Sequence, residues 1–127
     1  MTFRRNKRFR GNGEVVKIKC EKTMFDCELL HSYVQKLKGL EFKERDNRSY
    51  MFFDCNSIHT FGMKENIDVA FVSDFADVIE IYMNVGPNRL LKNKRAGAVI
   101  ERFASDEPWL TKGEIYWFDY REGDEEF

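Results

Sequence analysis

The chain has few of the residues that cross-link or interrupt a fold. Its 127 residues include three cysteines, two prolines and two histidines. An odd number of cysteines cannot form a fully paired disulfide framework. No run reaches the roughly 18 apolar residues that a transmembrane helix needs, so we expect no membrane span. The net charge of −1 excludes attraction of the whole surface to nucleic acid.

The two ends of the chain differ in charge from its middle. Residues 1–13 carry five basic side chains and no acidic one, whereas residues 121–127 carry four acidic side chains and one basic one. No apolar run of roughly 7–15 residues follows the basic start, as a secretion signal would require. We therefore expect a cytoplasmic protein with a flexible basic segment over 1–13, a single domain over 14–120 and an acidic tail over 121–127.

The pattern of the domain predicts a mainly β fold. Hydrophobic residues make up 43% of the chain and charged residues 34%, as in ordinary globular proteins. One helix is expected near 27–38, where Leu29, Tyr33 and Leu37 recur at helical spacing after a possible cap at Asp26. Elsewhere the apolar residues alternate or form short runs between turn residues, which is typical of strands. The expected strands cover 15–20, 40–43, 50–53, 67–72, 78–85, 98–103 and 114–120. This order favours an antiparallel β-sandwich or a barrel-like fold with one short helix.

Reactive side chains gather in residues 55–71. A thiol, an imidazole, an ammonium and a carboxylate occur there at Cys55, His59, Lys64 and Asp68. Asp68 interrupts an apolar predicted strand, so it must be solvated, paired or protonated, because burying an unpaired charge is very costly. Lys64 is one possible partner. Alternation along the strand places Asp68 at the mouth of one face, where a concave site could form.

The same segment carries a family resemblance. Residues 55–71 read Cys-Asn-Ser-Ile-His-Thr-Phe-Gly-Met-Lys-Glu-Asn-Ile-Asp-Val-Ala-Phe. This resembles Cys-x-Ser-[Val/Ile]-His-Thr-Phe-Gly-Met-[Arg/Lys]-x-Pro-Ile-Asp-[Val/Ile]-[Val/Ala]-Phe, the motif of one branch of the family called domain of unknown function 192. Here Asn66 replaces the family's proline, so the turn loses a fixed φ. Weaker matches at 39–40, 98–101 and 113–114 extend the resemblance to about residues 30–116. The resemblance implies a small, mostly β, sandwich-like fold with one short helix, and it implies no reaction because none is established for the family.

Two chemical interpretations use Cys55 and His59. A shared metal ion would need both ligands within about 2.0–2.3 Å of it, and a catalytic pair would need hydrogen-bond reach. Residues four apart on a straight strand lie about 13 Å apart at Cα, so only a turn near 54–57 could bring the two together. We therefore expect no metal and no cofactor, and we interpret Cys55 as a small buried residue.

The favoured interpretation is a non-enzymatic module that binds a small ligand or another protein. Its predicted binding residues are Cys55, His59, Met63, Lys64 and Asp68. The alternative is a small enzyme or metal-dependent protein that uses Cys55, His59 and Asp68.

A nucleic-acid partner is a further class to weigh. Basic residues cluster at 89–95 and could join the basic start of the chain in one patch. Binding of single strands also calls for exposed aromatic side chains beside the bases. The aromatic residues of this chain occupy positions typical of a core, so we do not expect nucleic acid to bind.

Overall fold

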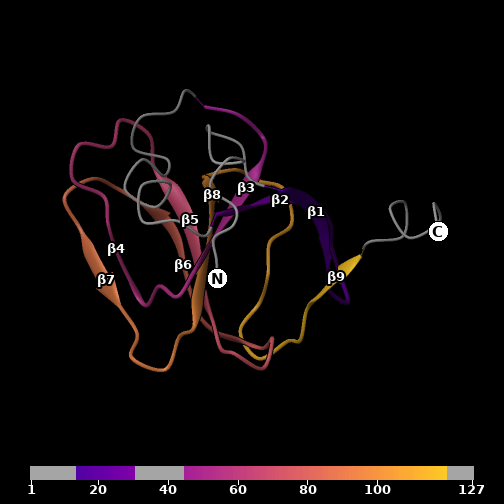
Figure 1. Cartoon of the computed structure of the whole chain (residues 1–127). Helices are drawn as coiled ribbons and strands as arrows, with labels where there is room; N and C mark the ends of the chain where they lie inside the picture. The colour runs from indigo at the N-terminus through magenta and orange to yellow at the C-terminus, as the bar shows by residue number, and fades with distance from the viewer. Residues whose placement is uncertain (1–13, 31–44, 120–127) are drawn as a thin grey trace.

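The computed structural model describes residues 14–30 and 45–119, and within them the chain forms nine β-strands (Figure 1). The prediction of a mainly β fold is confirmed. The strands are β1 (Glu14–Lys19), β2 (Met24–Leu30), β3 (Ser49–Phe53), β4 (Ser57–His59), β5 (Ile67–Val72), β6 (Val78–Val85), β7 (Leu90–Lys92), β8 (Ala98–Phe103) and β9 (Trp117–Asp119).

Seven of these strands form one curled sheet in the order β6-β5-β8-β3-β2-β1-β9, and β4 and β7 pair with each other in a separate small sheet. Every pairing is antiparallel except that of β2 with β3. The large sheet is not a closed barrel. It curls far enough, however, for Asp77 beside β6 to form a bridge with Ile115, just before β9.

The helix predicted near 27–38 is wrong where the structure can test it. No helix occurs among the described residues, and Cys27–Leu30 form the end of β2, paired with β3. The carboxylate of Asp26, the expected cap, instead binds the ammonium of Lys17 across the strand pair at 2.6 Å. Leu29 and Leu30 enter different cores on opposite faces of the sheet, and such an apolar run reads equally well as helix or strand. The rest of that range and the strand expected at 40–43 lie outside the described residues.

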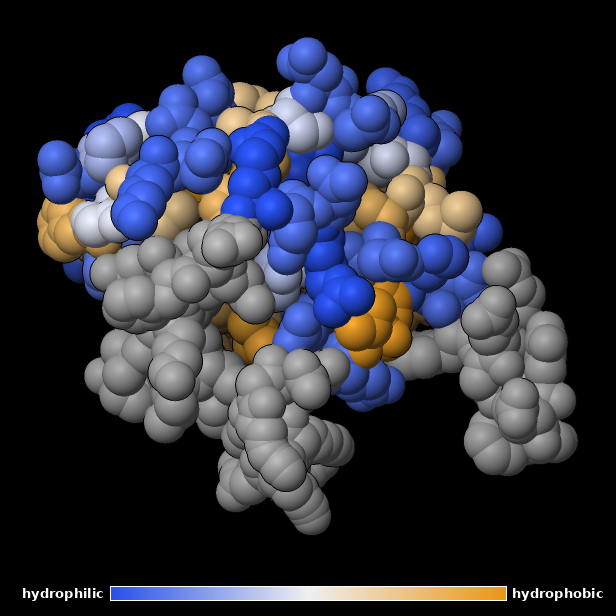
Figure 2. All heavy atoms as spheres, turned by 90° about the horizontal axis from the view of Figure 1, so that it is seen from above, coloured by the Kyte–Doolittle hydropathy of each residue, from blue (hydrophilic) through white to orange (hydrophobic). Residues whose placement is uncertain are grey.

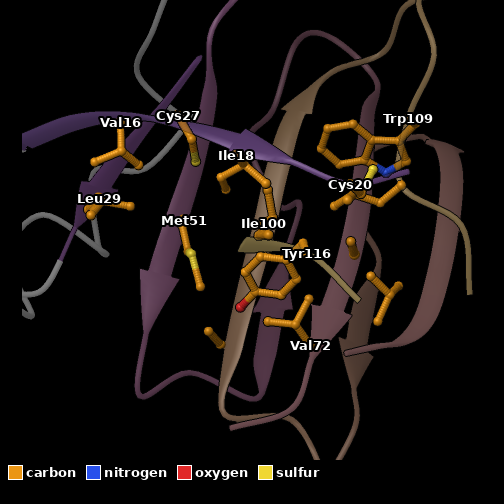
Figure 3. Packing of buried hydrophobic residues seen from close by; sticks show 14 residues of the cluster. Val16, Ile18, Cys20, Cys27, Leu29, Met51, Val72, Ile100, Trp109 and Tyr116 are labelled. Carbon is orange, nitrogen blue, oxygen red and sulfur yellow. The ribbon is translucent and has the colours of Figure 1, made fainter. Parts of the chain in front are cut away.

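Each face of the large sheet has its own hydrophobic core. The first core lies inside the curl, where Trp109 and Tyr116 from the segment before β9 pack against strand residues such as Ile18 and Ile100 (Figure 3). The second core lies on the other face and includes Leu91 of β7, with Ile58 of β4 packed against it. The small β4–β7 sheet therefore covers part of the outer face.

Strand β5 separates the two cores and is buried along its whole length. Ile67, Val69 and Phe71 belong to the second core, whereas Ala70 and Val72 belong to the first. This is the alternation that the sequence predicts. Asp68 shares the face of Ala70 and Val72, so its carboxylate points toward the first core side of the sheet.

Seen from above, hydrophilic residues cover most of the described surface, with separate apolar patches between them (Figure 2). All three cysteines lie in the described part of the chain and are free thiols. Within residues 14–30 and 45–119, no helix has the length and apolar character that crossing a bilayer requires.

Candidate functional site

Asp68 is a buried carboxylate with a full set of partners. Its side chain is 1% exposed, and its Oδ2 accepts a hydrogen bond from Arg102 Nε at 2.8 Å. The backbone N–H of Ser105 also donates to Oδ2, at 3.3 Å, and that of Asn84 donates to Oδ1, at 2.8 Å. The expectation of a partner is therefore confirmed, but the partner is Arg102 rather than Lys64. The expectation that Asp68 lies at the open mouth of a face is wrong, because the carboxylate is enclosed.

An irregularity in β6 supplies one of these hydrogen bonds. The register changes between the pair Ile67–Val85 and the pair Val69–Tyr82, so two residues of β6 face the single residue Asp68. Such a bulge frees a backbone group from the ladder. Asn84, one of the two, has a φ of 54° and turns its N–H to the carboxylate. Asp68 therefore stabilises the bulge.

Arg102 extends the ion pair into the segment that follows β8. It is the residue directly opposite Asp68 in the β5–β8 register, and its side chain is 10% exposed. Its guanidinium donates to the backbone carbonyls of Ser105, Glu107 and Pro108 at 2.8–3.3 Å. It also lies 4.4 Å from the centre of the Trp109 ring, a cation–π distance. The pair thus joins two central strands to the segment that closes the first core.

Thr60 is a second buried polar anchor, and this role was not predicted from the sequence. It is 1% exposed, its hydroxyl donates to the carbonyl of Gly86 at 2.8 Å, and the same oxygen accepts from the backbone N–H of Arg89 at 2.8 Å. Its backbone N–H donates to the carbonyl of Arg89 and its carbonyl accepts from Asn88 and Met63. The side chain and the backbone of Thr60 together therefore tie residues 60–63 to residues 86–89.

Thr60→Val should lower the free energy of unfolding by about 1–3 kcal/mol, because valine keeps the shape but leaves the Gly86 carbonyl and the Arg89 N–H without their partner. Urea unfolding of the variant and the wild type measures the difference. Ser57→Ala, which removes an exposed hydroxyl from β4, is the control and should change stability by less than about 0.5 kcal/mol. Equal losses for the two variants would contradict the anchoring role.

The loop between β4 and β5, which Thr60 and Asp68 anchor, exposes several side chains to solvent. His59 is exposed at the end of β4, and its ring stacks on Phe61 with the centroids 5.0 Å apart and the planes 23° apart. Phe61 is 49% exposed and Lys64 is exposed. Gly62 has a φ of 82°, in the left-handed region that favours glycine, so this position of the motif serves the turn.

Asn66, which stands where the resembling family has proline, closes the loop by hydrogen bonds instead. Its side-chain amide donates to the side chain of Asn84 at 3.1 Å. Its carbonyl accepts from the N–H of Ala104 at 3.0 Å. These bonds tie the loop to the β6 bulge and to the end of β8, and they replace the constraint that a fixed φ would give.

The five predicted binding residues fall into three different environments. Asp68 is enclosed with Arg102, while Cys55 and Met63 are half-buried against the second core, on the opposite face of the sheet. His59 and Lys64 alone are exposed. The structure thus does not bring Cys55, His59 and Asp68 into one cleft. The Cys55 thiol contacts the carbonyl of Ser57 at 3.2 Å, and across the described residues no three His, Cys, Asp or Glu side chains form a group that could hold a metal ion.

A cleft of about 450 Å³ lies beside the Asp68–Arg102 pair, between the β1–β2 pair and the segment after β8, and Arg102 and Ser105 line it. Its volume is within the range of small-ligand pockets. The cationic side chains on its wall already have acidic partners: Lys17 pairs with Asp26, Arg45 with Glu65, and Arg102 with Asp68. Its charges therefore offer less to a ligand than the exposed loop does.

The fold occurs in solved structures, whereas the sequence matches no protein-family model and no curated protein. A putative transcription regulator from Sinorhizobium meliloti 1021 is 12% identical, with a TM-score of 0.74 over 84% of this chain and 95% of that one. A protein of unknown function from Novosphingobium aromaticivorans DSM 12444 is 20% identical, with a TM-score of 0.69 over 86% of this chain and 89% of that one. At these identities the likeness shows a shared fold.

Proposed function

We propose that this chain is a non-enzymatic binding module that contacts its ligand or partner through the exposed loop of residues 59–66. The observation that carries the proposal is that the motif combines buried anchoring residues with exposed ones. Thr60 and Asp68 are buried and fully bonded, whereas His59, just before Thr60, and Phe61 and Lys64, between the two anchors, are exposed to solvent. A loop held at both ends by buried polar anchors loses little conformational freedom on binding, which favours affinity.

The alternative, a small enzyme or metal-dependent protein, draws less support from the geometry. Catalysis by a thiol needs a base within hydrogen-bond reach of it. The His59 ring is instead stacked on Phe61, and the Asp68 carboxylate is neutralised by Arg102 on the other face of the sheet from Cys55. We therefore retain the binding module, with no cofactor, and with a small ligand or a protein as the general classes of partner.

Membership of the domain of unknown function 192 family is part of the same proposal. Support comes from the physical roles of its motif positions in this chain: a buried hydroxyl at Thr60, a positive φ at Gly62 and a paired carboxylate at Asp68. These are roles that few other residue types could fill. A cytoplasmic location is also proposed, and the free thiols of the three cysteines suit a reducing compartment.

If the loop is the binding site, ligands should change the chemical shifts of its backbone amides. The full chain, labelled with ¹⁵N, is titrated separately with an oligonucleotide, an acidic peptide, a nucleotide mixture and anionic vesicles, and amide shifts are recorded. We expect at least one probe to shift the amides of residues 59–66. The double variant His59→Ala, Phe61→Ala should bind that probe at least about tenfold more weakly, because it removes two exposed rings.

A matched control separates this loop from exposed aromatic surface in general. Phe75, in the turn between β5 and β6, is 88% exposed, so Phe75→Ala should bind like the wild type. The melting temperature of each variant checks that the fold is kept. Shifts confined to other parts of the chain, or no binding of any probe, would refute the proposal.

A further inference from the structure

The two segments that meet at the small β4–β7 sheet are strongly basic, although the chain as a whole is not. Residues 55–66 and 86–97 together hold five lysines and arginines and one acidic residue, Glu65. Glu65 is paired with Arg45 at 3.3 Å. Within the described residues, none of the five basic side chains makes an ion pair; they are Lys64, Arg89, Lys92, Lys94 and Arg95. Glu80 of β6 also lies beside this region, where its carboxylate accepts a hydrogen bond from the side chain of Asn93 at 2.7 Å. Basic residues still outnumber acidic ones there, which suits an anionic partner.

Strand pairing shows which side chains share the outer face of the small sheet. Ile58 pairs with Leu91, and both point inward to the second core. Their neighbours along each strand must point outward. The outer face therefore carries His59 beside its cross-strand partner Leu90, which is 60% exposed, and Ser57 beside Lys92. Apolar and basic groups thus lie on one face.

The aromatic pair adds a chemical preference beyond charge. Phe61 is 49% exposed and stacked on His59, so a flat ring is displayed to solvent next to the bases. A ring of this kind can stack on a nucleobase, whereas simple attraction to anions does not use it. The sequence argued against nucleic acid because its aromatic residues looked like core residues. Phe61 is an exception, because it belongs to a turn and not to a strand.

The ring and the bases are held in a fixed relation by Thr60. The hydrogen bonds of its side chain tie the loop that carries Phe61 to the residues just before β7, including Arg89. Groups that are already ordered before binding lose less entropy when a ligand arrives. The surface is therefore ordered before a ligand binds, with one stacking ring at its edge and basic side chains along the adjoining strand and turn.

We propose that this face, formed by His59, Phe61, Leu90 and Lys92, with Lys64 and Arg89 in the adjoining loops, binds single-stranded nucleic acid. The inference rests on the proposed binding role of the 59–66 loop, and it replaces the general partner classes given there, a small ligand or a protein, with nucleic acid. The basic side chains attract the phosphates, and a nucleobase stacks on the Phe61–His59 pair. An anionic membrane would favour a larger apolar surface, and an acidic peptide would have no use for the stacking ring. The observations therefore favour a polyanion that also carries nucleobases.

The test measures binding of fluorescent oligothymidylate and oligouridylate to the full chain by anisotropy, over a range of salt concentration. Affinity should fall by roughly 100-fold between 50 and 200 mM salt if most of the five basic side chains contact phosphates. Phe61→Ala should weaken binding about tenfold without changing the salt slope, since it removes stacking. Lys92→Gln should flatten the slope by about 0.7, since it removes one phosphate contact.

Matched controls and competing ligands make each result decisive. Phe75→Ala and Lys22→Gln, at exposed turns elsewhere, should leave affinity and slope unchanged. If the Phe61 and Lys92 variants bind like the wild type, the nucleic acid is held elsewhere, for example by residues 1–13, and the inference is wrong. If a polyglutamate peptide, a DNA duplex or anionic vesicles bind more tightly than the single strands, and Phe61→Ala weakens that binding, the binding loop stands and its partner class is wrong. If none of these probes contacts the loop, both proposals fail.

Discussion

Asp68→Ala should lower the free energy of unfolding by about 3–5 kcal/mol, which is a large share of the stability of a small domain. The substitution leaves the guanidinium of Arg102, 10% exposed, without its counter-charge. It also removes the acceptor for the backbone N–H groups of Asn84 and Ser105. The β6 bulge and the segment after β8 lose their common anchor at the same time. Urea unfolding, followed by tryptophan fluorescence, measures the loss.

The control for Asp68 is Glu65, an acidic residue of the same loop. Glu65 and its partner Arg45 are each 47% exposed, and exposed ion pairs contribute only about 0–1 kcal/mol. Glu65→Ala should therefore have little effect. Similar losses in the two variants would show that the buried pair does not stabilise the fold.

A second set of variants keeps the test informative if Asp68→Ala does not fold. Asp68→Asn keeps the shape and one acceptor oxygen but loses the charge, so it should fall between the wild type and the alanine variant. The double variant Asp68→Ala, Arg102→Met should be less destabilised than the sum of its single changes, because no buried charge is left unpaired. Strict additivity would argue against direct coupling of the two side chains.

Three strands of the large sheet could be predicted with their bounds because their sequence signal is local. The expected strands 67–72, 78–85 and 98–103 have the bounds of β5, β6 and β8. Each is a short run of β-forming residues between turn residues. Strands β5 and β8 are buried along their whole length, as such runs indicate, whereas β6 is partly exposed. Strands β4 and β7 are only three residues long. Such short strands lie below what alternation can show, and they form because they pair with each other.

The candidate site could be predicted only in part, because its partners are distant in sequence. A carboxylate inside an apolar strand indicated that Asp68 needs a partner. Arg102 gives the same signal, as a charge inside the apolar run 98–103, but 34 positions separate the two. Only the β5–β8 register places them opposite each other. Thr60 gives no such signal, since its hydroxyl bonds to backbone groups 26 and 29 positions away.

Glu101, which ends the weak family match at 98–101, is a buried carboxyl. It lies on β8 between Tyr50 of β3 and Val69 of β5, and it is 6% exposed. By alternation it shares the face of Val99 and Phe103, which belong to the second core. Among the described residues it has no hydrogen-bond or ion-pair partner. Burial alone raises the pKa of Glu101 from 4.5 to about 8, because desolvation penalises the charged form.

This shift in pKa predicts a loss of stability as the pH rises. Below about pH 4.5 the carboxyl is protonated in both states, so burial costs no charge. Between pH 4.5 and about 8 the unfolded chain releases the proton while the folded chain retains it, and the folded state loses stability steadily. Above about pH 8 the loss is complete and amounts to about 5 kcal/mol. A neutral side chain of the same shape should escape this loss.

Glu101→Gln should therefore match the wild type in stability near pH 4.5 and exceed it increasingly as the pH rises, by up to about 5 kcal/mol above pH 8. Urea unfolding at intervals from pH 4.5 to 9 gives the difference directly. Glu21→Gln changes an exposed carboxylate in the turn between β1 and β2, so its curve should run parallel to that of the wild type. If the Glu101→Gln curve is also parallel to the wild-type curve, Glu101 ionises in the folded chain as it does in the unfolded one. The carboxyl would then have to reach water or a cation, and the second core would be more open at β8 than its packing indicates.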